Sequence, residues 1–153
     1  MKIYQPIRSS PIWDDSGSGA DDNVAIWSLT PPSAEYECLG HVATKGNSIQ
    51  PKLSNYRCVR KDYLEDTTII SGHPIWDDSG SGADDDFAAF QIFETVWHGL
   101  SHTTRITLPM GLFWSHSSHD SPTFTSAKGL KYQSSVKCTS SYNDCTAIDW
   151  QTY

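Results

Sequence analysis

A string of twelve residues, PIWDDSGSGADD, occurs twice in this chain, at positions 11–22 and again at positions 74–85. A packed core tolerates exchanges of similar volume, and a glycine-rich linker varies freely, so neither role requires an identical polar string. Two copies that begin 63 residues apart indicate internal pseudo-symmetry, with each copy opening a similar structural unit. The repeat therefore restricts the chain to folds that are built from related units.

The segments that follow these copies have the pattern of short β-strands. Apolar residues alternate or occur in short runs, and clusters of Gly, Pro, Asn, Asp and Ser separate the runs. No segment has the spacing of a long amphipathic helix, so we expect an all-β fold. The expected strands span residues 24–29, 36–43, 56–60, 67–70, 87–97, 105–108, 112–116 and 129–136.

The length of 153 residues suits a single domain with a hydrophobic core. Within it we expect repeat units over residues 9–70, 71–110 and 111–137, followed by a tail over 138–153. The third unit is degenerate, because the segment from Phe113 to Asp120 keeps an aromatic pair, serines and one acid but lacks the glycines and acid pairs. Three sheet-forming units around an axis predict a β-prism, whereas two decorated units would make a β-sandwich.

Negative charge is concentrated in the two repeated segments. The formal net charge is −7, which argues against a nucleic-acid partner. Half of the eighteen acidic residues lie in or directly after the repeats, at Asp14, Asp15, Asp21, Asp22, Asp77, Asp78, Asp84, Asp85 and Asp86. The remaining chain is nearly neutral, so the repeats are two acidic patches on an otherwise balanced surface.

Each acidic loop has the composition of a site for a hard cation. Carboxylates held close together repel one another unless a positive charge lies between them, and Ca²⁺ accepts about six to eight oxygen ligands. Glycines at 17, 19, 80 and 82 permit a positive φ that turns backbone carbonyls inward. Oxygen-only ligands favour Ca²⁺ over zinc or copper. The expected ligands are Asp14, Asp15, Asp21, Asp22, Asp77, Asp78, Asp84 and Asp85.

A purely structural role for the same residues is the alternative. Asp and Ser side chains in such loops can cap turns by accepting hydrogen bonds from nearby backbone N–H groups. The spacing does not fit an EF-hand, because an EF-hand loop started at Asp15 has glycines at its third and fifth positions. Duplication of four acids in each copy favours metal or ligand binding over capping alone.

Several ordered segments resemble the vacuolar protein sorting-associated protein 62 family. These are IWDDSGSGADDNVAIW at 12–27, YECLGHV at 36–42, Pro51, and YRCVRKDYL at 56–64, so the resemblance covers about residues 9–92. Two departures are Glu35, where the family prefers Gly, and Phe90, where a second Trp is expected. The resemblance implies a β-prism-like domain used for membrane or glycan recognition, sometimes attached to pore-forming proteins.

Tryptophans beside the loops point to a ligand. Trp13 and Trp76 directly precede the acidic pairs, and Trp114 has the corresponding place in the degenerate unit. An indole face can stack on a sugar ring beside a calcium ion that binds hydroxyls, although Trp also packs in cores. We therefore expect a calcium-dependent carbohydrate-binding, lectin-like module. The expected ligand-binding residues are Trp13, Gly17, Gly19, Trp76, Gly80, Gly82, Trp114 and Asp120.

Two other binding roles stay open. Calcium in the loops could bridge to an anionic membrane surface, in a lipid-binding or toxin-targeting module. Alternatively, calcium could only rigidify the loops, with the binding face elsewhere. Glycans are the first expected partner and anionic membranes the second, no nucleic acid is expected, and an oligomer is compatible with the sequence.

We do not expect an enzyme, because the chain has no multi-part catalytic motif. The segment SHSSHD at 115–120 contains the residue types of a catalytic triad, but no GxSxG motif is present. Neither a secretory signal nor an apolar membrane-spanning run occurs, so three alternatives stay open: a cytoplasmic protein, a non-classically secreted protein, or a mature form whose leader is missing.

The four cysteines allow three pairings if all are oxidised, and free thiols are equally open. Cys138 with Cys145 would close a short loop, and Cys38 with Cys58 could link neighbouring strands. The sequence contains no CxxC spacing, so a structural zinc site held by cysteines is not expected.

Overall fold

The computed structural model describes residues 2–67, 73–98, 104–120, 127–130, 136–138 and 145–147. Its strands are β1 (Ile3–Tyr4), β2 (Arg8–Asp14), β3 (Val24–Thr30), β4 (Tyr36–Glu37), β5 (Val42–Lys45), β6 (Cys58–Arg60), β7 (Leu64–Thr67), β8 (Trp76–Asp77), β9 (Ala88–His98), β10 (Thr104–His116), β11 (Ala127–Leu130), β12 (Val136–Cys138) and β13 (Cys145–Ala147). Two short 3-10 turns span Leu53–Asn55 and Lys61–Tyr63. The described part contains no α-helix, which confirms the all-β expectation.

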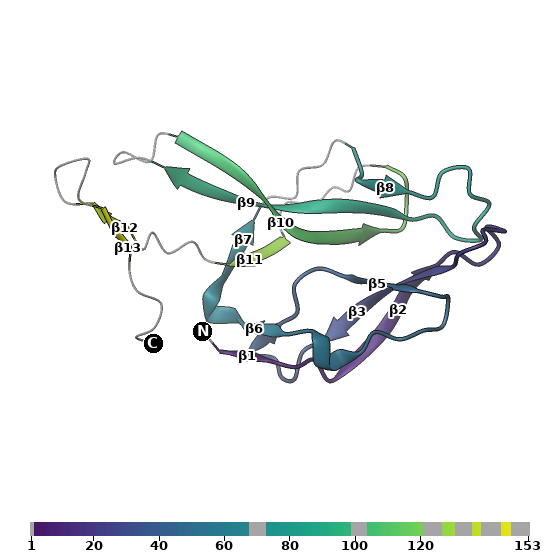
Figure 1. Cartoon of the computed structure of the whole chain (residues 1–153), viewed down its shortest axis with the longest axis horizontal. Helices are drawn as coiled ribbons and strands as arrows, with labels where there is room; N and C mark the ends of the chain where they lie inside the picture. Colours follow the sequence, from purple (N-terminus) through teal and green to yellow (C-terminus); the bar gives the residue numbers. More distant parts are fainter. Residues whose placement is uncertain are drawn as a thin grey trace.

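The sequence repeat corresponds to two similar antiparallel sheets. One has the order β2-β3-β5 and the other β8-β9-β10, and each acidic loop joins an edge strand to the central strand. The registers match as well, since Asp14 lies opposite Ala25 in the first sheet and Asp77 lies opposite Ala88 in the second. Both loops project at the same end of the molecule (Figure 1).

Smaller sheets complete the fold. They are a three-stranded sheet with the order β1-β6-β4 and the pairs β7-β11 and β12-β13, all antiparallel. A disulfide joins Cys38, just after β4, to Cys58 at the start of β6. Cys138 and Cys145 lie opposite each other in the β12-β13 register. Several small antiparallel sheets are compatible with both the prism and the sandwich expected from the sequence.

The start of β9, over residues 88–92, packs on both faces and divides the core into two clusters. Ala88, Phe90 and Ile92 pack with Ala127 on one side, with Leu112 and Trp114 against them. On the other side Ala89 packs with Phe87, Trp13 and Ile26. This alternation follows from the two-residue period of a strand. Because Trp13 and Ile26 come from β2 and β3, the second cluster joins the two repeat units.

Several strand expectations differ from the structure in their limits. The strand expected over 56–60 begins at Cys58 (β6), and the strand expected over 67–70 lies instead at Leu64–Thr67 (β7) within the described residues. The segment expected as one strand over 36–43 is divided into β4 and β5, and Gly40 between them approaches the Phe113 carbonyl, 2.9 Å from where a Cβ would lie. Conversely, the strands expected at 105–108 and 112–116 form one strand, β10, with a register shift between Pro109 and Phe113. The strand β10 therefore crosses residues 110 and 111, where the second and third repeat units were expected to meet.

The strand β2 was not expected, because Pro11 interrupts its pattern. The structure places Pro11 on an edge strand, beside a register shift between Pro11 and Trp13. Edge strands and bulges are where a sheet tolerates proline, since no ladder hydrogen bond is lost there.

The parts of expected strands at 68–70 and 131–135 lie outside the described residues. Within the described ranges, no helix is long and apolar enough to cross a membrane.

Candidate functional site

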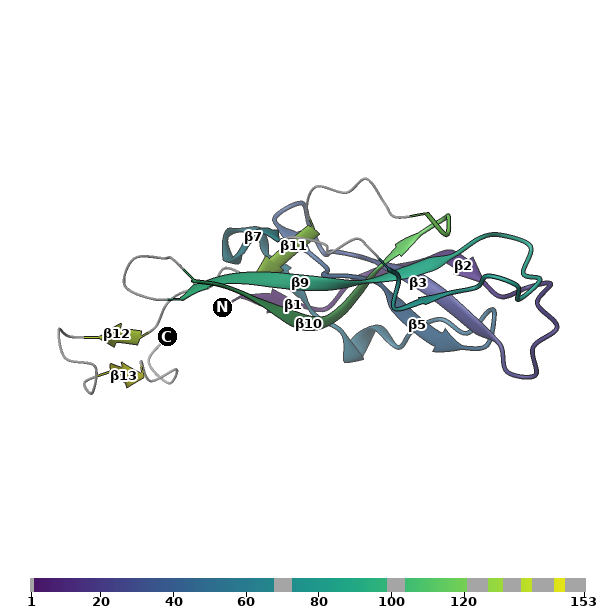
Figure 2. The same cartoon turned by 90° about the horizontal axis from the view of Figure 1, so that it is seen from above.

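The two acidic loops, residues 14–23 (the first loop) and 77–86 (the second loop), lie in contact at one end of the molecule (Figures 1 and 2). The Asp84 N–H donates to the Ser16 carbonyl at 2.9 Å. The Trp13 indole N–H donates to the Asp85 carbonyl at 2.7 Å. Together these bonds hold the second loop against the start of the first.

A buried aspartate closes each loop in the same way. Val24 N–H donates to Asp15 Oδ1 at 3.2 Å in the first loop, and Phe87 N–H donates to Asp78 Oδ1 at 2.8 Å in the second. The backbone N–H groups of Asp15 and Asp78 donate in return to the carbonyls of Val24 and Phe87. Both aspartates are buried, so their carboxylates are held in place by the strand that follows.

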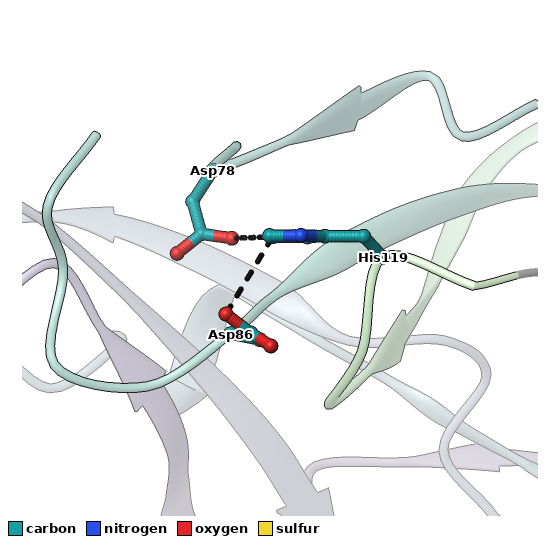
Figure 3. A group of neighbouring side chains, drawn as sticks. All are labelled: Asp78, Asp86 and His119. Atoms are coloured by element: carbon teal, nitrogen blue, oxygen red, sulfur yellow. Dashed lines mark hydrogen bonds and ion pairs between the residues drawn. The ribbon is translucent and has the colours of Figure 1, made fainter. Parts of the chain in front are cut away.

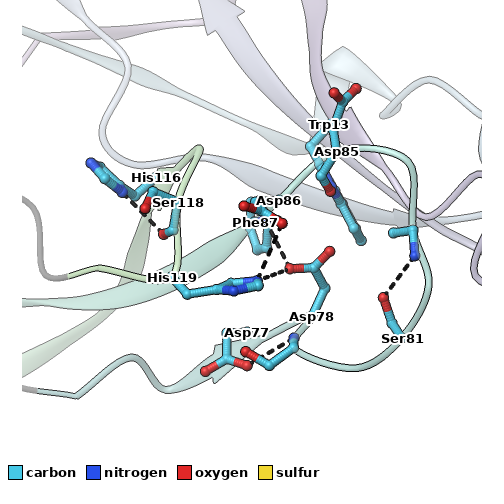
Figure 4. Close-up of polar contacts among 12 residues, drawn as sticks. Trp13, Asp77, Asp78, Ser81, Asp85, Asp86, Phe87, His116, Ser118 and His119 are labelled. Carbon is cyan, nitrogen blue, oxygen red and sulfur yellow. Dashed lines mark hydrogen bonds and ion pairs between the residues drawn. The ribbon is translucent and has the colours of Figure 1, made fainter.

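The neighbouring side chains cap the turns of both loops. Asp14 and Asp77 accept hydrogen bonds from the backbone N–H groups two residues later, at 2.9 and 3.0 Å. Asp77 accepts hydrogen bonds from the side chain and the backbone N–H of Ser79. These bonds are the main reason that the pKa of Asp77 lies below its usual value. The hydroxyls of Ser18 and Ser81 accept from Ala20 and Ala83, and Figure 4 shows the second loop. The capping alternative therefore describes four of the eight expected calcium ligands, Asp14, Asp15, Asp77 and Asp78.

The repeated glycines have the backbone conformation that the sequence predicted. Positive φ angles occur at Gly17, Gly19, Gly80 and Gly82, at 88°, 69°, 75° and 82°. Gly17 also lies against the second loop, where an added Cβ would be 2.5 Å from Asp84 Oδ1. Its counterpart Gly80 has no atom within 4 Å of such a Cβ. The two loops are thus alike internally but differ in their surroundings.

The other expected calcium ligands, Asp21, Asp22, Asp84 and Asp85, are exposed. Asp22 forms an exposed ion pair with Lys45 at 2.7 Å. Among the described residues, the eight expected carboxylates do not converge on one point as a set of ligands. The donor atoms that do lie within 4.8 Å of one another belong to Asp78, Asp86 and His119. Calcium as the partner of the loops stays a prediction.

This cluster brings the turn after β10 onto the second loop, and its three side chains point toward one another (Figure 3). His119 Nε2 lies 2.6 Å from Asp78 Oδ1 and 3.8 Å from Asp86 Oδ1. The Asp78 side chain is only 3% exposed, whereas that of Asp86 is 66% exposed. The hydrogen bond to Asp78 raises the pKa of His119, and the nearby carboxylates add to the rise while desolvation opposes it.

Sequence reasoning missed Asp86 and His119 as site residues. Asp86 is the first position after the identical strings, and the corresponding residue of the first copy is Asn23. That difference was a usable signal, since it separates two loops that are otherwise the same. His119 offered no comparable signal, because its partner Asp78 lies 41 residues away in the chain.

The three expected ligand-binding tryptophans have different surroundings. Trp13 is buried and stacks on Phe87 with ring centroids 4.8 Å apart. Trp114 is half-buried and packs against His41 at 4.6 Å. Trp76 is 48% exposed and meets Trp13 edge to face. Of these three rings, Trp76 therefore offers the most surface to a ligand. The remaining expected ligand residue, Asp120, is exposed, and its N–H donates to Ser118 Oγ.

Trp76 borders an apolar cleft between the two repeat units. The cleft has a volume of about 220 Å³ and lies at the base of the acidic loops, since Val24 and Phe87 directly follow them. Its lining residues are Val24, Ile26, Ala43, Ile75, Trp76, Phe87, Ala89 and Phe113. An apolar floor with carboxylate-rich loops beside it can hold a ligand that has both an apolar face and hydroxyl groups.

No family model and no curated protein matches this chain. Among solved structures, the chain is similar to the crystal structure of GNIP1Aa from Chromobacterium piscinae, with 25% identity and a TM-score of 0.50. The match covers 86% of this chain but 21% of that chain, so the present chain corresponds to about a fifth of GNIP1Aa. The similarity is one of fold over most of the chain. The resemblance to the vacuolar protein sorting-associated protein 62 family stays a prediction.

Proposed function

We propose that this chain is a non-enzymatic carbohydrate-binding module, and that it binds its ligand at the cleft below the acidic loops. The observation that carries the proposal is the half-exposed Trp76 ring in an apolar cleft, two of whose lining residues, Val24 and Phe87, directly follow the acidic loops in the chain. The apolar face of a sugar ring stacks on an indole, while sugar hydroxyls donate to carboxylate oxygens.

Calcium dependence belongs to this proposal. Asp21, Asp22, Asp84 and Asp85 are exposed in two loops that touch, so their charges repel one another. A bound Ca²⁺ would offset this repulsion and could also accept hydroxyl oxygens from a sugar. Chelation should then weaken sugar binding without unfolding the protein.

The test is a glycan array probed with the protein in calcium and again with chelator, followed by titration of the best ligand. Replacing Trp76→Ala should weaken binding about tenfold, a loss of about 1.4 kcal/mol, because the stacking surface is removed. Tyr4→Ala is the matched control, since Tyr4 is also an exposed aromatic residue but lies in β1, outside the cleft. Absence of any retained glycan, or equal affinity of the Trp76→Ala variant, contradicts the proposal.

Calcium-bridged binding to an anionic membrane is the second candidate. It is favoured by Ile12 and Ile75, which are exposed at equivalent positions before the two loops, and by the exposed Trp76 that follows Ile75. Exposed apolar side chains next to a cation site could enter a lipid interface. Sedimentation with phosphatidylserine vesicles that needs calcium, and that free sugars do not reverse, would support this function instead of glycan binding.

A further inference from the structure

We propose that Asp78, Asp86 and His119 bind one divalent cation of the zinc class, and that only the second of the two repeated loops carries this site. The donor atoms already lie close together, with His119 Nε2 at 2.6 Å from Asp78 Oδ1 and 3.8 Å from Asp86 Oδ1. In a tetrahedral zinc site, with bonds of about 2.0–2.1 Å, neighbouring donor atoms lie roughly 3.3 Å apart. The observed distances lie on either side of that value, and all three donor atoms lie within 4.8 Å of one another.

The donor set selects the type of ion. Two carboxylate oxygens and one imidazole nitrogen suit zinc and similar transition metals, whereas calcium and magnesium prefer oxygen ligands alone. Three protein ligands leave a fourth position for water or for a ligand group. This site therefore differs from the oxygen-only calcium site proposed for the loops, and its existence does not depend on sugar binding.

The protein holds the central ligand in place before any metal arrives. Asp78 is 3% exposed at its side chain, and the Phe87 N–H donates to the same Oδ1 atom that faces His119. Such a second partner orients a metal-binding carboxylate and reduces the cost of ordering it. Asp86 reaches the site from the end of the same loop, and His119 from the turn after β10, as Figures 3 and 4 show. A bound ion would thus connect that turn to the second loop.

The first loop is an internal comparison within the same chain. Asp15 makes the same two loop-closing hydrogen bonds as Asp78. The position of Asp86, however, is occupied by Asn23. Within the described ranges, Asp15 belongs to no group of three potential metal ligands. The two loops therefore share the capping hydrogen bonds but differ at the position of Asp86, which supplies a metal ligand only in the second loop.

The competing explanation is an ion pair in which a protonated His119 lies between two carboxylates. Calorimetric titration of the metal-free full chain with ZnCl₂, and separately with CaCl₂, distinguishes the two. We expect about one zinc ion per chain, and a zinc affinity that millimolar calcium does not reduce. Asp86→Asn, which gives the second loop the residue of the first, and His119→Gln should each lower zinc affinity at least tenfold.

Glu35→Gln is the matched control, because it removes one exposed carboxylate outside both loops and should leave zinc affinity within twofold. Asn23→Asp should not create a second site, since no histidine is hydrogen-bonded to Asp15 among the described residues. Circular dichroism verifies the fold of each variant. Absence of zinc binding, or equal zinc binding by His119→Gln, shows an ion pair only and overturns the proposal. Neither result affects the glycan array, whose readout is separate.

Discussion

At the scale of single residues, internal hydrogen bonds explain part of the uniformity of the repeated string. Asp15 and Asp78 each close a loop, Asp14 and Asp77 each cap a turn, and the serines accept from the next turn. A buried carboxylate that lost its N–H donor would cost about 1–3 kcal/mol, so substitutions within the string are poorly tolerated. Capping therefore accounts for the first two aspartates and the second serine of each copy, whereas the exposed aspartates at the end of each copy take no part in it.

Gly17 and Gly80 offer a test of how the loops differ. Alanine at either position must adopt a positive φ, which costs roughly 1–2 kcal/mol. At Gly17 the new methyl group would also displace the Asp84 carboxylate and disturb the contact between the loops. We expect Gly17→Ala to lower the free energy of unfolding by about 1 kcal/mol more than Gly80→Ala. Urea denaturation measures both, and equal losses would show that the loop contact is not formed in solution.

At the scale of the strands, polar and proline-containing segments acquire their structure from neighbours. The strand β2 has Pro11 in its pattern, yet it pairs with β3 over Arg8–Asp14. The backbone hydrogen bonds to β3 stabilise this segment as a strand although its own residues have a low strand propensity. Likewise β10 remains one strand despite its register shift, because β9 pairs with it on both sides of the irregularity.

The Cys38–Cys58 disulfide fixes the region between β4 and β6, where the strands are only two or three residues long. Closing a loop with a sequence separation of 20 should contribute about 3 kcal/mol by restricting the unfolded chain. We expect the free energy of unfolding of the double variant Cys38→Ala with Cys58→Ala to be lower by this amount, so that the variant unfolds at a lower urea concentration. Free-thiol titration of the unfolded wild type provides the control, and an unchanged unfolding midpoint would contradict the prediction.

At the scale of the whole molecule, a few polar contacts connect the units in addition to the shared core. Trp13 donates to Asp85, Asp84 donates to Ser16, and His119 meets Asp78. These contacts run from one unit to the next and are not reciprocal, since Gly80 lacks the contact that Gly17 makes. Two units related by a two-fold axis would make each contact twice, once in each direction. Contacts made in one direction only are typical of units that follow one another in a repeat.

His41 connects the first unit to β10 and should make stability depend on pH. Its Nδ1 accepts the Ser115 N–H at 3.0 Å, its ring packs on Trp114, and burial lowers its pKa to about 4. The unfolded chain binds a proton below about pH 6.5, while the folded chain binds it only near pH 4. Stability should therefore fall as the pH drops from 6.5 to 4, by about 1–3 kcal/mol once partial exposure of the ring is allowed for.

The variant His41→Asn keeps a hydrogen-bond acceptor but has no titratable group. The difference in unfolding free energy between wild type and variant should shrink or reverse between pH 6.5 and pH 4, because only the wild type loses this contribution. Urea denaturation at a series of pH values measures the difference. Parallel curves for the two proteins would show that His41 does not titrate differently on folding.

The sequence alone determined the all-β class, the repeat, the positive φ of the loop glycines and the long strand β9, because each depends on local pattern. It could not determine that Trp13 is buried while Trp76 is exposed, since both follow the same Pro-Ile pair. Only the packing of one unit on the next distinguishes them. The same reason applies to His119, whose place beside Asp78 and Asp86 depends on how β10 returns along β9. The repeated string forms loops with the same internal hydrogen bonds, and unequal neighbours give the two loops different surroundings.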